Sequence, residues 1–277
     1  MQLWFSELQT PHMKISCRVK EVLHREKSPY QEIAVLDTYQ FGRMLTLDDV
    51  IQTSERDEFV YHEMLVHLPL LTHRDPRRVL VIGGGDGGSV REVLKHPSVE
   101  QVVLAEIDER VVEVARCFLP TISCALHDPR VRLQIGDGIR HVQENPNTYD
   151  VILVDSTDPV GPAVGLFSAD FYRSVHAALR PGGVFAAQTE SPFFNQDLIK
   201  RVYQDVSAIF TAAGLYLAVV PTYPGGMWSF TIGAKDGALH GWSRERAAGL
   251  PTRYYSPELH EEAFTLPVFV KELLEKE

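Results

Sequence analysis

The chain has 277 residues, of which 44% are hydrophobic and 23% are charged, and its formal net charge is −10. These proportions are typical of a globular protein with one or two domains. The negative charge argues against a nucleic-acid partner, whose phosphates attract basic surfaces, and is compatible with cationic ligands.

The chain shows no targeting or membrane signal. Its first residues lack a basic region followed by an apolar core, and no apolar run approaches the ~18 residues of a membrane span. Cys17, Cys117 and Cys124 have neither paired nor metal-type spacing, which suits a reducing compartment. We therefore expect a cytoplasmic protein with no membrane partner.

Residues 1–54 show the partial alternation of β-strands in three segments, 15–22, 32–36 and 43–47. They predict a small antiparallel sheet, which should pack on the rest of the chain or on another subunit because it is too small to be stable alone. Ser54 and Asp57 resemble a capping box. The helix that they would begin is expected to run from residue 55 to 68 and to end before Pro69.

Beyond Arg77, apolar strands alternate with helices. The predicted strands are 79–82, 101–107, 131–135, 151–155, 184–188, 216–220 and 230–234, and the helices between the first six are 90–95, 110–118, 138–144, 170–179 and 195–213. This alternation predicts a parallel sheet covered on both faces. Because residues 221–229 are too few for a helical crossover, the last strand should be antiparallel.

The expected fold is therefore α/β, a seven-stranded methyltransferase-like (Rossmann-type) sheet whose last strand is antiparallel, preceded by a small N-terminal antiparallel β domain. We expect the β domain at 1–54 and the Rossmann-like domain at 55–277, with a peripheral helix in 266–277.

A glycine-rich stretch follows the first strand of the larger sheet, at residues 83–88, and Asp86 interrupts it. A strand, a glycine turn and a helix form the first unit of a nucleotide-binding α/β fold. A loop that binds pyrophosphate offers backbone N–H groups to an anion, which a carboxylate at its centre would repel. The ligand is therefore expected to be neutral or cationic where it meets Asp86.

Acidic residues also follow the next three strands, where α/β sheets bind ligands. Glu106 suits the two ribose hydroxyls, and Asp137 suits an adenine amino group, so we expect a bound adenosine. Asp155 and Asp158 follow the fourth strand and join Asp86 on the same rim. A Mg²⁺ ion there would need a phosphate or more oxygen ligands, so we expect no metal but a polyvalent cationic substrate.

The chain resembles the polyamine aminopropyltransferase (spermidine synthase) family. The motifs that carry the resemblance occur in family order: Tyr30-Gln31, Gln52-Thr53-Ser54-Glu55-Arg56-Asp57-Glu58-Phe59-Val60-Tyr61-His62-Glu63-Met64, Gly83-Gly84-Gly85-Asp86-Gly87-Gly88, Glu106-Ile107-Asp108, Gly136-Asp137-Gly138, Asp155-Ser156-Thr157-Asp158-Pro159-Val160-Gly161-Pro162, Pro221-Thr222-Tyr223-Pro224-Gly225-Gly226 and Tyr254-Tyr255-Ser256.

The resemblance implies a homodimer or homotetramer that transfers an aminopropyl group from decarboxylated S-adenosylmethionine, a co-substrate, to putrescine, giving spermidine and methylthioadenosine without a cofactor. It places the donor on Gln31, Asp86, Glu106, Asp137, Gly138 and Pro162. It places the acceptor on Gln52, Tyr61, His62, Asp155, Asp158, Gln188 and Tyr223. Position 62 is His or Gln in the family, and Met227-Trp228 differs between members where the acceptor pocket could be shaped.

The expected chemistry is direct displacement at the carbon beside the donor's sulfonium. The attacking amine must be neutral, yet an alkyl amine has a pKa near ~10.4 and arrives protonated. Asp155 is the candidate for the base that accepts its proton, with the Tyr61 hydroxyl sharing the hydrogen bonds. Asp158 would hold the diamine, and Asp86 the donor's primary ammonium.

Three other functions compete with this interpretation. An S-adenosylmethionine methyltransferase shares the sheet, but Asp86 would repel the carboxylate of the full donor. A non-catalytic polyamine or nucleoside sensor should lack the base that Asp155 and Tyr61 provide. An NAD-dependent dehydrogenase is disfavoured by Asp86 and the reversed last strand. The choice among putrescine, cadaverine, agmatine and spermidine stays open.

Overall fold

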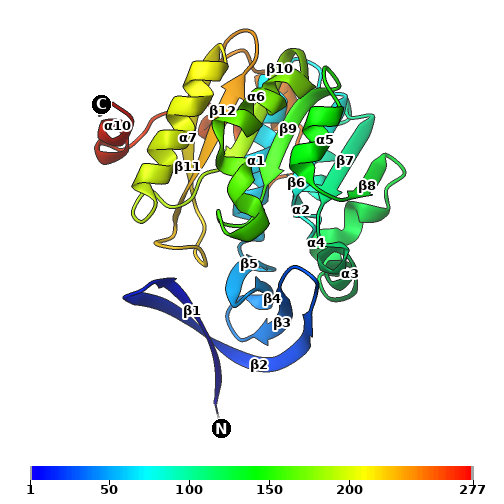
Figure 1. The fold of residues 1–277 in the computed structure, drawn as a ribbon, viewed down its shortest axis with the longest axis vertical. Coiled ribbons are helices and arrows are strands. Elements are labelled where there is room, and N and C mark those ends of the chain that lie inside the picture. Colours follow the sequence, from blue (N-terminus) through cyan, green and yellow to red (C-terminus); the bar gives the residue numbers. More distant parts are fainter. Residues whose placement is uncertain (1, 276–277) are drawn as a thin grey trace.

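A computed structural model describes residues 2–275 and contains two sheets (Figure 1). The first is a five-stranded antiparallel sheet whose strands lie in chain order: β1 (Leu3–Thr10), β2 (Met13–Lys27), β3 (Glu32–Thr38), β4 (Gly42–Leu47) and β5 (Val50–Ser54). The predicted small antiparallel sheet is confirmed, although β1 and β5 were not expected from the sequence. Whether residues 1–54 form a separate domain stays a prediction.

The second sheet has seven strands: β6 (Arg78–Gly83), β7 (Gln101–Glu106), β8 (Val131–Ile135), β9 (Tyr149–Asp155), β10 (Leu179–Gln188), β11 (Ala212–Val219) and β12 (Met227–Ala234). Their order is β11-β12-β10-β9-β6-β7-β8. Strand β12 is antiparallel to β10 and β11, and the pairs from β10 to β8 are parallel. The predicted fold class is confirmed.

The helices are α1 (Glu58–Thr72), α2 (Gly88–Val93), α3 (Glu109–Phe118), α4 (Pro120–Ser123), α5 (Gly138–Glu144), α6 (Ala169–Ala178), α7 (Gln196–Ile209), α8 (Arg244–Ala248), α9 (Pro257–Glu262), α10 (Val268–Glu275) and the 3₁₀ helices η1 (Cys124–His127) and η2 (Gly161–Phe167), and both faces of the sheet carry helices. Alternate residues of β6 face opposite sides. Val79 and Val81 pack in the hydrophobic core that α1 shares with one face of the sheet. Leu80 and Ile82 pack in the core that α6 and α7 share with the other face. Across residues 2–275, no helix has the length and apolar character needed to cross a membrane.

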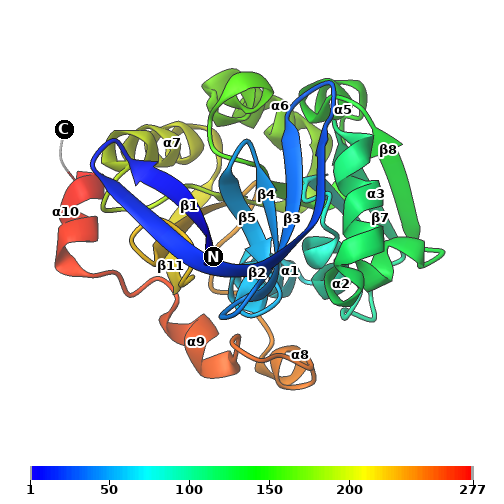
Figure 2. The ribbon, with the colours of Figure 1, turned by 90° about the horizontal axis from the view of Figure 1, so that it is seen from below.

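The small sheet lies against the rest of the chain (Figure 2), and apolar side chains from both parts share one core. Ile33 and Val35 of β3 share one core with Val111 and Val114 of α3. This packing agrees with the expectation that the sheet is too small to stand alone. It also brings β3 and β5 over the edge of the larger sheet.

Two of the predicted helices have wrong boundaries. Helix α1 begins at Glu58 and continues through Pro69 to Thr72. No capping box forms, because Asp57 accepts a hydrogen bond from the Ser54 hydroxyl at 2.6 Å and two more from Thr222, whose backbone N–H lies 3.0 Å away. Likewise the helix predicted to reach residue 213 ends at Ile209, and the chain turns into β11 at Ala212.

Every residue of α1 except Phe59 is buried, including ionisable side chains. Glu63 is 1% exposed, and its carboxylate accepts hydrogen bonds from the backbone N–H groups of Arg253, Tyr254 and Tyr255 at 2.7–3.1 Å. A buried carboxylate needs such partners because water cannot solvate it. Glu63 therefore anchors the C-terminal segment, at residues 253–255, to α1.

Replacing Glu63 with Ala should destabilise the fold by about 3 kcal/mol, because three backbone amides, of which that of Tyr255 is buried, lose their acceptor. Urea unfolding measures this loss, and limited proteolysis should cut the variant first in residues 250–275. Glu245→Ala, at an exposed position of α8, is the control and should unfold as the wild type does. Equal stability of the Glu63→Ala and control variants would contradict the anchoring role.

Candidate active site

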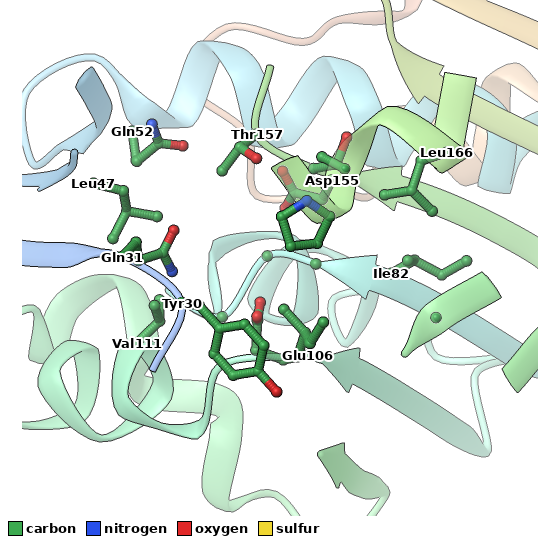
Figure 3. Close-up of a pocket in the computed structure, with 18 of the residues that line it drawn as sticks. Tyr30, Gln31, Leu47, Gln52, Ile82, Glu106, Val111, Asp155, Thr157 and Leu166 are labelled. Atoms are coloured by element: carbon green, nitrogen blue, oxygen red, sulfur yellow. The ribbon is translucent and has the colours of Figure 1, made fainter. Parts of the chain in front are cut away.

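A cleft of about 440 Å³ lies between the two sheets, at the carboxyl ends of β6, β7, β8 and β9. Figure 3 shows Gln31 and Gln52 reaching it from the small sheet, opposite Glu106 and Asp155 from the large one. The chain leaves β6 towards β7 on one side, and β9 pairs with β6 on the other. The cleft is thus at the topological switch point, where α/β sheets bind ligands.

The structure brings all the predicted site residues to this region. A smaller cavity of about 30 Å³ continues the cleft and shares Gln52, Tyr61, Asp158 and Tyr223 with it. The predicted site residues that line the large cleft are Gln31, Gln52, Tyr61, His62, Asp86, Glu106, Asp137, Gly138, Asp155, Asp158, Pro162 and Tyr223. Gln188 lines only the smaller cavity. Their individual roles stay predictions.

The glycines of the loop after β6 make room for side chains of the site. Gly84 has a φ of 67°, and a Cβ there would lie 2.5 Å from an Asp155 carboxylate oxygen. At Gly88, a Cβ would lie 2.2 Å from the His62 ring. Because these contacts are shorter than van der Waals distance, the loop can carry Asp86 into the cleft only with glycine at both positions.

Three ionisable side chains meet in the centre of the cleft. One atom each of His62, Asp86 and Asp155 lies within 4.8 Å of the others. The His62 Nδ1 is 2.6 Å from Glu58, and its Nε2 is 3.5 Å from Asp86. Although burial opposes protonation, these carboxylates raise the pKa of His62 well above its usual value. An imidazolium has no lone pair for a metal, so this trio is better suited to charge balance than to metal binding.

The pKa values of the two aspartates in this trio are shifted in opposite directions. Burial raises the pKa of Asp155, and the neighbouring Asp86 raises it further. Burial acts on Asp86 too, but the charge of His62 outweighs it, and the pKa of Asp86 is lowered. The Tyr61 and Ser89 hydroxyls donate hydrogen bonds to Asp155 at 2.8 and 2.7 Å. Asp155 is thus the more basic carboxylate, and two hydroxyl groups orient it.

Glu106 marks the opposite part of the cleft, at the end of β7. Burial raises its pKa to about 7, although its carboxylate accepts a hydrogen bond from the Asp108 N–H at 2.9 Å. Gln31 donates to the Asp108 carboxylate at 2.9 Å, which ties the small sheet to this strand end. Asp137 lines the cleft and also caps α5 by accepting from the Ile139 N–H at 2.8 Å.

Two further acids lie near Asp158, and neither was predicted from the sequence. Glu7 of β1 is 3% exposed and lines the smaller cavity; burial raises its pKa to about 7. Glu190 follows β10, and burial together with the nearby Asp158 carboxylate raises its pKa well above normal. Glu190 continues the pattern of acids at strand ends, which could have identified it. No sequence signal links Glu7 to this region.

Aromatic rings form a wall between Asp155 and this acidic end. The ring centroids of Tyr61 and Tyr223 are 5.5 Å apart, and those of Tyr223 and Trp228 are 4.7 Å apart. The Tyr223 hydroxyl donates to the Gln52 carbonyl at 2.6 Å. The site thus combines a basic aspartate, an apolar wall and a distant group of carboxylates, an arrangement suited to a flexible molecule with cationic ends.

Comparison with known proteins agrees with this geometry. The spermine/spermidine synthase domain matches residues 58–240, and the spermidine synthase tetramerisation domain matches residues 3–55. The polyamine aminopropyltransferase of Moorella thermoacetica is 59% identical over 275 residues, covering 99% of this chain and 96% of its own. That of Shouchella clausii is 50% identical over 274 residues, covering 99% and 100%.

Solved structures with the same fold come from the same family. A spermidine synthase in complex with the transition-state analogue AdoDATO has a TM-score of 0.96 and 40% identity, covering 98% of this chain and 94% of its own. The spermidine synthase of Thermotoga maritima has a TM-score of 0.93 and 38% identity, with the same coverage of both chains. This chain therefore belongs to the spermine/spermidine synthase family of aminopropyltransferases.

Proposed function

We propose that this enzyme transfers the aminopropyl group of decarboxylated S-adenosylmethionine to putrescine, giving spermidine and methylthioadenosine. The observation that carries this proposal is the row of acids along one cleft, from Glu106 through Asp86 and Asp155 to Asp158. A nucleoside donor and an acceptor with two ammonium groups would satisfy all four. The spermidine synthase solved with AdoDATO shares this fold, which supports the assignment.

The donor would extend from Glu106 to Asp86. The ribose hydroxyls would donate to Glu106, and the adenine would lie by Asp137, Gly138 and Pro162, with Gln31 closing the cleft from the small sheet. The donor's primary ammonium would meet Asp86, which His62 keeps ionised. The carboxylate of full S-adenosylmethionine would be repelled at this point, which disfavours a methyltransferase.

The acceptor would lie along the Tyr61 and Tyr223 rings, with His62 and Gln52 beside it. Its remote ammonium would lie between Asp158, Glu7 and the Gln188 amide. An ammonium among these carboxyl groups favours their ionised forms, so it would offset the rise in pKa that burial imposes on Glu7.

Transfer then needs a single displacement. The neutral amine nitrogen attacks the carbon beside the sulfonium, and the C–S bond breaks with its electron pair passing to sulfur. Before the attack, Asp155 accepts the proton that the arriving ammonium must lose, because its raised pKa narrows the gap to that of the amine, and the product keeps the positive charge as a secondary ammonium. Tyr61 stays a neutral donor to Asp155, because burial raises its pKa well above normal.

The chain is also proposed to assemble with identical copies through its small sheet. Leu3, Trp4 and Leu8 of β1 are 48%, 53% and 73% exposed, an apolar surface that another subunit would cover. The tetramerisation domain matched by residues 3–55 supports assembly, and both a dimer and a tetramer fit this surface. A cytoplasmic location stays a prediction.

Asp155→Asn should lower kcat by ~10²–10⁴, the usual contribution of a general base, and leave methylthioadenosine affinity unchanged. Release of methylthioadenosine from the decarboxylated donor and putrescine gives kcat, and calorimetry gives the affinity. Asp170→Asn, whose side chain is 90% exposed, is the matched control and should keep full activity. A fully active Asp155→Asn enzyme would exclude the base role, and no release from wild-type protein with any amine would refute the proposed function.

Asp86→Asn should lower the affinity for the decarboxylated donor by about 10-fold or more, because the donor's ammonium loses a buried ionic partner. Methylthioadenosine lacks that ammonium and serves as the internal control, so its affinity should not change. Calorimetric titration of each ligand into the wild type and the variant makes the comparison. An equal loss for both ligands would mean that Asp86 shapes the glycine loop and does not bind the ammonium.

Leu8→Asp should shift the protein towards its monomer of 31.2 kDa, because it places a charge in the proposed interface. Light scattering coupled to size-exclusion chromatography gives the mass. The control is Val219→Asp, which changes an apolar residue of β11 that is 56% exposed. A wild-type protein that elutes as a monomer would rule out this assembly.

A further inference from the structure

We propose that Ser89 is a positioning residue for the transfer reaction, because it holds one oxygen of Asp155 and leaves the other to accept the proton of the acceptor's ammonium. This inference rests on the proposed function and deepens it, since it names the atom of the base that acts and a group that keeps the base ionised. Ser89 lies in the first turn of α2 and is 0% exposed. Its hydroxyl donates a hydrogen bond to Asp155 Oδ2 at 2.7 Å.

The direction of the Ser89 hydroxyl separates this residue from an ordinary helical serine. A serine hydroxyl inside a helix commonly bonds to a backbone carbonyl of the preceding turn. The Ser89 hydroxyl instead reaches Asp155, which is 66 residues further along the chain. Within the described residues, 2–275, it has no other hydrogen-bond partner. Removing this hydroxyl therefore changes the surroundings of Asp155 and leaves every other polar group of the protein paired as before.

The two oxygens of Asp155 lie in different surroundings. Oδ2 lies against the glycine loop, because a Cβ at Gly84 would be only 2.5 Å from it. Oδ1 accepts from the Tyr61 hydroxyl at 2.8 Å, and Tyr61 lines both the large cleft and the smaller cavity that continues it. A carboxylate oxygen can accept two hydrogen bonds. Oδ1 thus has a lone pair left for an amine that lies along the Tyr61 ring, whereas Ser89 occupies Oδ2 on the side of the loop.

The Ser89 hydrogen bond also favours the ionised form of Asp155. The titratable groups that face this carboxylate are Tyr61 and His62 of α1, Asp86 of the glycine loop and Tyr223 of the turn before β12. Burial raises the pKa of Asp155, His62 lowers it and Asp86 raises it again, while the hydroxyls of Ser89 and Tyr61 lower it by donating to the charged form. A base must be ionised when the ammonium arrives. The Ser89 bond therefore increases the fraction of enzyme that is ready to accept a proton.

The test measures kcat against pH for the wild type, Ser89→Ala and Ser89→Thr, from methylthioadenosine release at saturating decarboxylated donor and putrescine. The acid limb of this profile reports the ionisation of Asp155 in the complex. Loss of a hydrogen bond to the charged form raises the pKa of Asp155, so the limb of Ser89→Ala should move to higher pH by about one unit. Below the limb the variant should then be about 10-fold slower than the wild type. Ser89→Thr keeps the hydroxyl and should restore the wild-type limb.

A second measurement places Ser89→Ala in the Asp155→Asn background. If Ser89 acts through Asp155, the double variant should have the kcat of Asp155→Asn alone, because residues that act as one unit are not additive.

The matched control is Ser123→Ala. Ser123 is 3% exposed, donates to the Ala115 and Leu119 carbonyls and lines neither cavity, so its pH profile should match the wild type. An unmoved acid limb in Ser89→Ala overturns the inference, and so does a further loss of kcat in the double variant as large as that in the single one. Failure of the wild type with every amine would instead refute the proposed function.

Discussion

The structure depends on the pairing of ionisable side chains along α1, a helix that is buried except at Phe59. Glu58, His62, Glu63 and His67 are all 6% exposed or less. An unpaired buried charge costs several kcal/mol, so each of these groups requires a partner from another element. Glu58 pairs with Arg91 at 2.8 Å, and the other partners come from α2, the glycine loop and the C-terminal segment. The charges thus specify which elements surround α1.

The same pairing gives the active site two different aspartates. His62 lies one residue from Tyr61 on α1, so the helix delivers a cation and a hydroxyl to the cleft together. The cation lowers the pKa of Asp86, whereas burial raises that of Asp155. Two identical side chains within one cluster therefore suit opposite tasks, holding an ammonium and accepting a proton. The glycine loop alone, without His62, would not give the two aspartates different pKa values.

Much of the site could be predicted from sequence because the carboxyl ends of parallel strands meet at one edge of a sheet. Glu106 and Asp155 end buried strands, so their convergence follows from the strand pattern. Contacts between distant segments carry no such signal. The Ser54–Asp57 spacing indicated a capping box, but Asp57 accepts hydrogen bonds from the Ser54 hydroxyl and from the distant Thr222. Glu7 was missed for the same reason, since only the docking of β1 brings it to the cleft.

Charge cannot distinguish one linear diamine from another, because every linear diamine carries the same ammonium groups at its ends. In the proposed reaction, selection by length would therefore come from the separation between Asp155, on the large sheet, and the acids at the far end of the cleft. One of those acids, Glu7, belongs to the small sheet. The distance between Asp155 and Glu7 thus depends on how the two sheets are joined. They are joined by the apolar core shared by β3 and α3 and by the hydrogen bond from Gln31 to Asp108. The position of Glu7 relative to Asp155 thus depends on the packing between the sheets and not on the carboxylates alone.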